Sequence, residues 1–157
     1  MKNRYFMAAV TSVLTFVFAF SIFASTTVKT AGGTLKYTDV HSQTAEFIGY
    51  NKSIVLTKQQ ERIKLEVLSS IPASCCSSYS MATCCCPCNL AKSVWGLSNY
   101  LVAKKNYDAP RLKQAVLEWM KFTNKNGYSG DACFQDNCNQ PFQQNGCGGM
   151  NETRISF

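Results

Sequence analysis

The chain has 157 residues and a formal net charge of +7 at pH 7. Its lysines are scattered and form no patch interleaved with aromatic residues, which argues against nucleic acid as a partner. All nine cysteines lie between Cys75 and Cys147, at a density typical of a disulfide or thiolate scaffold. Because His41 is the only histidine, the sequence offers no Ser-His-Asp or Cys-His catalytic arrangement.

Residues 1–24 have the features of a signal peptide or an N-terminal membrane anchor. Lys2 and Arg4 precede an uncharged, largely apolar run over residues 5–24, which is just long enough to span a bilayer. Small residues such as Ala24 also provide cleavage sites for a signal peptidase. In both cases the positive charges keep the N-terminus inside, so the remaining chain is expected to be extracytoplasmic: periplasmic, secreted or anchored. Contact with a membrane is expected only through residues 5–24, if they are not removed.

The next segment, residues 25–51, is polar and shows no sustained apolar period, which predicts a poorly ordered stretch. The cysteine-rich helical domain is therefore expected over residues 52–157. It is predicted to open with a short β-branched strand at 52–57.

A first helix is predicted over residues 58–70. Thr57 and Gln60 have the spacing of a capping box, and Pro72 is expected to end the turn that follows the helix. The apolar residues along one side of this helix recur every four positions, at Ile63, Val67 and Ile71.

Two further helices are predicted over residues 89–104 and 109–125. Asp108 is a good N-cap for the second of them, and the short link makes the two helices antiparallel neighbours. Gly96, in an otherwise good helix, predicts close approach by another backbone or a large side chain. The expected fold is mainly α: a small cysteine-rich domain built on an antiparallel helical hairpin, with one preceding helix and a cysteine-stapled C-terminal loop. The apolar face of the first hairpin helix comprises Leu90, Val94, Leu97 and Leu101.

The hairpin has a consequence for the cysteines, because the start of its first helix lies beside the end of its second. The run at 84–88 precedes the first helix, and the remaining cysteines of the C-terminal part follow the second. We therefore expect one sulfur-rich pole, where a sulfur of the run lies close to Cys133, Cys138 or Cys147.

The spacing of these sulfurs predicts a soft-metal site. Thiolates bind Cu(I) and Zn(II), and Cys-x-Cys and Cys-x-x-Cys spacings direct several sulfurs toward one ion. The expected activity is non-catalytic metal binding. The predicted ligands are Cys84, Cys85, Cys86, Cys88, Cys133, Cys138 and Cys147.

Two other interpretations stay open. The cysteines can be disulfide staples of an extracytoplasmic structural or interaction domain with a protein partner, although their odd number leaves at least one sulfur over. Alternatively, Cys85 and Cys88 form a Cys-x-Pro-Cys motif that suits a thiol–disulfide oxidoreductase. The segment before this motif does not have the pattern of the buried strand that a thioredoxin-like fold requires.

The run Cys84-Cys85-Cys86-Pro87-Cys88-Asn89 resembles the motif of the bacterial PCYCGC-motif proteins, which are small, exported and rich in cysteine. The resemblance covers about ten residues, and the run lacks the alternating cysteines that follow proline in that family. It implies a metal-linked role outside the cytoplasm.

Overall fold

The computed structural model describes residues 35–74, 76–129 and 139–157. The chain divides into two units, residues 1–31 and 32–157, and every described residue belongs to the second. The described residues are mainly helical, as predicted, with a single two-stranded sheet. None of their helices is long and apolar enough to cross a membrane. The predicted signal peptide or anchor lies outside the described residues.

The first helix, α1 (Val40–Ser53), corrects the prediction of a poorly ordered stretch for its C-terminal part, residues 40–51, whereas residues 25–34 lie outside the described residues. Asp39 caps it by accepting a hydrogen bond of 2.6 Å from the backbone N–H of Ser42. Residues 52–57 form no strand, because the helix extends to Ser53 and an irregular link follows it. One buried face holds the helix on the domain through Val40, Thr44, Phe47 and Ile48.

The second helix, α2 (Lys58–Ser69), confirms the predicted helix over 58–70. Its N-terminus has the full capping box, in which Thr57 accepts from the N–H of Gln60 and the Gln60 side chain accepts from the N–H of Thr57. The helix is followed by a short antiparallel hairpin of β1 (Pro72–Ala73) and β2 (Cys76–Ser80). This hairpin was not predicted from the sequence.

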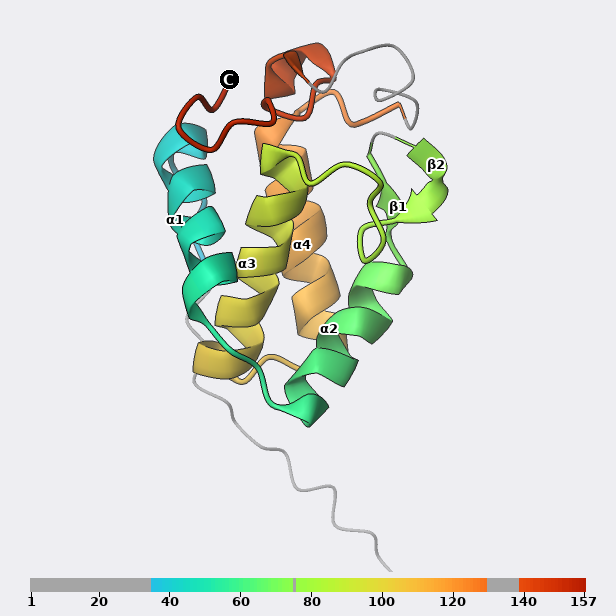
Figure 1. Ribbon diagram of the computed structural model, residues 1–157. Coiled ribbons are helices and arrows are strands. Elements are labelled where there is room, and N and C mark those ends of the chain that lie inside the picture. The colour runs from blue at the N-terminus through green and yellow to red at the C-terminus, as the bar shows by residue number, and fades with distance from the viewer. Residues whose placement is uncertain (1–34, 75, 130–138) are drawn as a thin grey trace, which may run out of the picture. The chain divides into compact units, whose positions relative to one another are not determined.

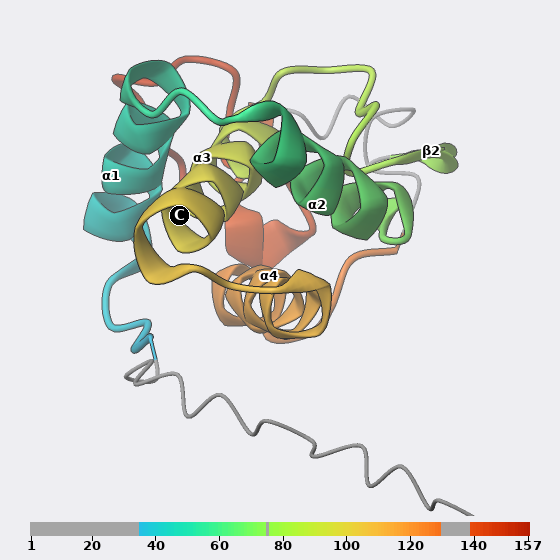
Figure 2. The ribbon, with the colours of Figure 1, turned by 90° about the horizontal axis from the view of Figure 1, so that it is seen from below.

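The predicted helical hairpin is confirmed as α3 (Asn89–Lys105) and α4 (Ala109–Thr123). Asn106 ends α3 in the left-handed conformation, at φ 52°, and Asp108 then caps α4 by accepting from the N–H of Arg111. Figure 2, which looks from below, shows α3 with α1, α2 and α4 around it. The hairpin therefore supplies the central helix of the domain.

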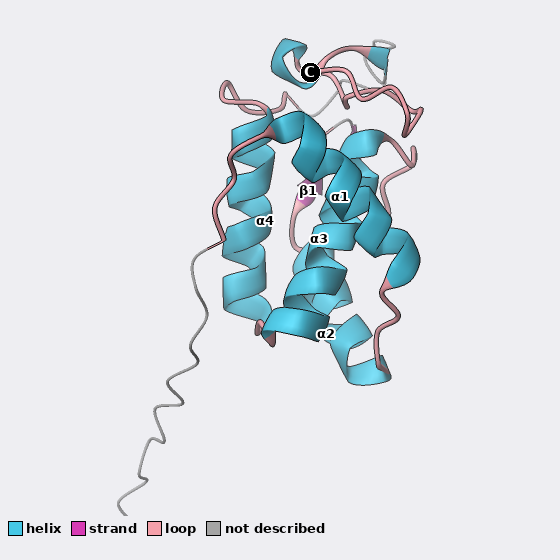
Figure 3. Cartoon of the chain, turned by 90° about the vertical axis from the view of Figure 1, so that its left-hand side faces the viewer, coloured by secondary structure: helices cyan, strands magenta, loops and turns pink. Residues whose placement is uncertain are grey.

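The core is built on this central helix. Leu97 and Leu101 of α3 are fully buried, and Trp119 of α4 packs edge-on against Phe47 of α1, with ring centroids 4.9 Å apart. Figure 3 shows α1 crossing α3 on the side that faces the viewer. At Gly96 the two helices approach so closely that an added Cβ atom would lie 2.7 Å from the backbone nitrogen of Asn51. The predicted close approach at Gly96 is thus confirmed.

The C-terminal segment lies at the end of the hairpin where α3 begins and α4 ends, drawn in red in Figure 1. It contains the short 3-10 helix η2 (Phe142–Gln144), whose Phe142 ring is fully buried. The segment returns on itself, because Phe142 N–H donates to Ser156 and Ser156 N–H donates to Gly148. It therefore covers the end of the domain to which the cysteine run leads.

Candidate functional site

The cysteine run leads directly into the N-terminus of α3. Cys88 is the N-cap residue, in extended conformation, and its side chain makes no capping hydrogen bond. The first two N–H groups of the helix are satisfied by the C-terminal segment instead: Asn89 donates to the carbonyl of Gly149 at 2.9 Å, and Leu90 to that of Cys147 at 3.1 Å. A distant loop thus caps the helix, and this capping brings Cys147 beside Cys88.

The Asn89 side chain fixes the loop in this position. It is fully buried, and its amide nitrogen donates to the carbonyls of Gly148 and Asn151, both at 2.9 Å. Gly148 has φ +73°, and an added Cβ would lie 2.6 Å from ring atoms of Phe142, so no other residue fits there without rearrangement. Two buried features, an amide and a ring, therefore set the path of the chain just after Cys147.

Three sulfurs meet at this point, and we call Cys84, Cys88 and Cys147 the thiol cluster. The Cys88 side chain hydrogen-bonds with those of both Cys147 and Cys84. Cys88 and Cys147 are each 1% exposed, whereas Cys84 is half-buried and packs against the core. The predicted sulfur-rich pole is confirmed for Cys147. Cys133 and Cys138 lie outside the described residues, so their predicted place in it stays a prediction.

The cluster holds Cys88 in its protonated form. The hydrogen bond with Cys147 lowers the pKa of the Cys88 thiol, but the hydrogen bond with Cys84 and burial outweigh it and raise that pKa to about 12. The buried thiol is consequently a poor nucleophile at neutral pH, because the thiolate is the reactive form.

The remaining cysteines of the run are Cys85 and Cys86. The sulfurs of Cys85 and Cys86 are 3.5 Å apart, and Cys85 is exposed while Cys86 is half-buried. The redox pair of Cys85 and Cys88 stays a prediction. Cys76, at the start of β2, is half-buried.

The thiol cluster is not arranged as a coordination shell. Within residues 35–74, 76–129 and 139–157, no group of three or more His, Cys, Asp or Glu side chains is placed to hold a metal ion. The predicted ligand set therefore stays a prediction. Sequence reasoning also missed Asn89, the residue that positions the loop, and the Gly148-Gly149 pair after Cys147 is the one local signal of the close approach there.

Comparison with known proteins adds no family to this picture. No protein-family model matches the chain, and no curated protein or solved structure is significantly similar to it. The resemblance to the PCYCGC-motif proteins stays a prediction.

Proposed function

We propose that the protein binds a soft metal ion, Cu(I) or Zn(II), outside the cytoplasm, through the thiolates of Cys84, Cys88 and Cys147 and without catalysing a reaction. The observation that carries the proposal is the contact of Cys88 with the thiols of both Cys84 and Cys147. Because no three of the described side chains form a ready coordination shell, binding would require these thiol side chains to rearrange around the ion. A disulfide would join two of them and leave the third in contact with it. A thiophilic ion can take all three.

Binding would displace the thiol protons, because a thiolate is the form that coordinates a metal. The three thiols would release up to three protons for each ion bound. The loop that carries Cys147 would exclude water from the ion, and Asn89 would hold that loop in place. Cys85 and Cys86, which lie between Cys84 and Cys88 in the chain, would deliver an ion to the cluster or complete its ligand set.

The test is metal uptake by reduced protein, measured by elemental analysis after equilibrium dialysis against Cu(I) or Zn(II). We expect one ion per chain in the wild type and proton release on binding. Cys84→Ser should abolish stoichiometric uptake, and because this side chain is only half-buried the fold should survive, as circular dichroism would show. Cys76→Ser is the matched control, since Cys76 is also half-buried but lies outside the cluster. Unchanged uptake in Cys84→Ser would refute the proposed ligand set.

A disulfide staple is the alternative that the burial of Cys88 and Cys147 favours. A bond between them would close a loop of 60 residues and would stabilise the domain by about 4 kcal/mol in the chain-entropy description. Thiol counting on protein purified without reductant distinguishes the two functions. At most one free thiol per chain and no bound metal would establish a structural or interaction domain, whose partner would then be another extracytoplasmic protein.

A further inference from the structure

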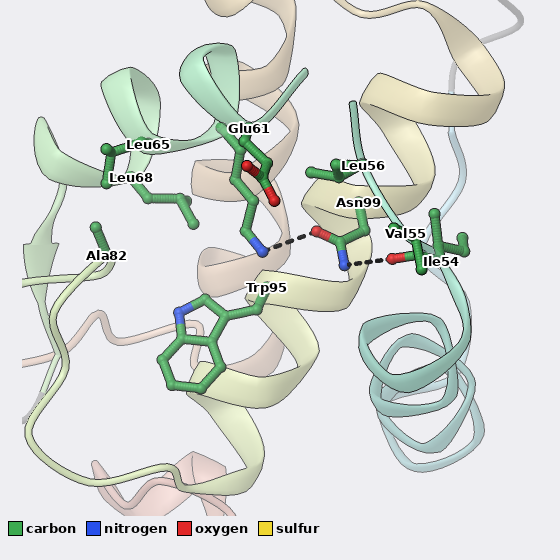
Figure 4. Close-up of a pocket in the computed structure, with 10 residues that line it drawn as sticks. Ile54, Val55, Leu56, Glu61, Leu65, Leu68, Ala82, Trp95 and Asn99 are labelled. Carbon is green, nitrogen blue, oxygen red and sulfur yellow. Dashed lines mark hydrogen bonds between the residues drawn. The ribbon is translucent and has the colours of Figure 1, made fainter. Parts of the chain in front are cut away.

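A pocket of about 510 Å³ lies between α2, α3 and the link that joins α1 to α2. Figure 4 shows its apolar wall, formed by Leu65 and Leu68 of α2 and by Trp95 of α3, with Val55 on the link. The volume is in the range of small-molecule sites, which are mostly apolar with a few polar groups. None of the described residues that line the pocket is a cysteine, so the pocket is distinct from the thiol cluster.

The pocket is lined in part by large apolar side chains that are exposed to water. Val55 is 90% exposed and Leu65 is 58% exposed, and they are the two most exposed large apolar side chains among the described residues. Both line this one pocket. An apolar ligand that covered them would gain free energy in proportion to the area removed from water.

Lys64, the one cationic side chain among the described residues that line the pocket, gives it a polar centre. The Lys64 ammonium donates a hydrogen bond of 2.8 Å to the side-chain oxygen of Asn99, and the Asn99 amide donates to the carbonyl of Ile54 at 3.2 Å, so the ammonium is held in place. Lys64 forms no ion pair with a carboxylate of the described residues. An ammonium has three donors, and Asn99 takes one. Two donors are left for a ligand.

We propose that this pocket binds a small monocarboxylate with an apolar tail, whose carboxylate pairs with Lys64 while the tail covers Leu65 and Trp95. The carboxylate of Glu61 also lines the pocket, as Figure 4 shows. Its negative charge next to a single cation disfavours a doubly charged group such as a phosphate monoester. Glu61 repels a singly charged headgroup less than a doubly charged one, and the attraction for a carboxylate comes from the two ammonium donors of Lys64 that Asn99 does not use.

The test uses octanoate as the probe, with octan-1-ol as an uncharged ligand of the same tail length. Isothermal titration calorimetry should show saturable octanoate binding, and octanol should bind at least tenfold more weakly because it lacks the charge-assisted hydrogen bond. Lys64→Gln should weaken octanoate binding at least tenfold and leave octanol binding unchanged. Lys64→Met serves as a second variant, which keeps the packing of the side chain. Lys58→Gln is the matched control, since Lys58 is on the same helix but outside the pocket.

Three results would overturn the proposal: no saturable octanoate binding, equal binding of octanoate by wild type and both Lys64 variants, or tighter binding of octyl phosphate than of octanoate. A second copy of the chain could cover the same surface instead. Sedimentation velocity would then show a dimer that Leu65→Asp converts to a monomer, and this outcome would also refute the small-molecule ligand. A monomeric wild type that binds octanoate through Lys64 supports the proposal.

Discussion

The contact between α1 and α3 at Gly96 allows a sharp test of the packing. An added Cβ atom would lie 2.7 Å from the backbone nitrogen of Asn51 and closer still to the carbonyl oxygen of Phe47, and Cβ contacts below 3.0 Å are essentially never found. Alanine favours a helix over glycine by about 1 kcal/mol. Overpacking costs about 1–3 kcal/mol or more, and the upper end applies because the obstructing atoms are backbone that can move only with the whole of α1. We expect Gly96→Ala to lower the free energy of unfolding by about 2 kcal/mol.

The assay is thermal unfolding followed by circular dichroism, where a loss of this size lowers Tm by about 5–10 °C in a domain of this length. Gly49→Ala is the matched control, because Gly49 is also within a helix but an added Cβ would meet no atom within 4 Å. This control should raise the free energy of unfolding by up to about 1 kcal/mol. If Gly96→Ala also raised Tm, the close approach of the two helices would be refuted.

Three further predictions follow from the caps and the buried tyrosine. Asn89→Leu should lower the free energy of unfolding, measured by urea unfolding, by about 2–4 kcal/mol, because it leaves two carbonyls without their hydrogen-bond donor. A loss below about 0.5 kcal/mol would contradict the role of this amide. Thr57→Ala should cost about 1 kcal/mol in the same assay through loss of its cap on α2, and no loss would mean that this helix end frays. The Tyr37 hydroxyl donates a hydrogen bond to the carbonyl of Ala115, and burial, with a smaller effect of the Glu118 charge, raises the pKa of this tyrosine. The stability that Tyr37 adds is therefore complete below about pH 10 and is lost as pH rises toward the pKa of the folded state. Tyr37→Phe should therefore be less stable at pH 7 but lose less stability between pH 9 and 11, and parallel pH profiles of the two proteins would exclude this effect.

The helices of the hairpin could be predicted because their sequences show both a helical repeat of apolar residues and recognisable capping residues. Leu97 and Leu101 lie on a strongly apolar face, and Asp108 marks the start of the second helix. The capping box at Thr57 fixed the start of α2 in the same way. In each case the capping hydrogen bond and the buried apolar face indicate the same helix, so the helix can be predicted without information from distant residues.

The helix α1 was missed because its buried face contains a polar residue. Val40, Thr44, Phe47 and Ile48 have the spacing of a helical face, but Thr44 interrupts the apolar pattern, and Gly49 weakens helix propensity. The energy that holds this helix comes from its contact with α3 and Trp119 rather than from its own sequence. Tertiary packing of this kind cannot be read from a local pattern.

The thiol cluster was predictable in part. The antiparallel hairpin indicated that Cys147 would lie near the run, since the chain must return to the same end. The contact of Cys147 with Cys88 depends on the loop carbonyls that cap α3, and the path of this loop is set by Asn89 and the two glycines after Cys147. The sequence contains those residues but gives no indication that they meet.

The loop that caps α3 also affects when Cys88 can reach its final surroundings during synthesis of the chain. The side chain of Asn89 and the carbonyl of Gly148 that it binds are 59 positions apart, so the environment of Cys88 is complete only after the end of the described chain has emerged. Until then the nearest sulfurs for Cys88 are its neighbours in the run, and bonds among them form with little loop-closure entropy. Early oxidation would therefore join Cys88 to another cysteine of the run before Cys147 is present. A newly made chain kept reduced until Cys147 arrives can assemble the native arrangement directly.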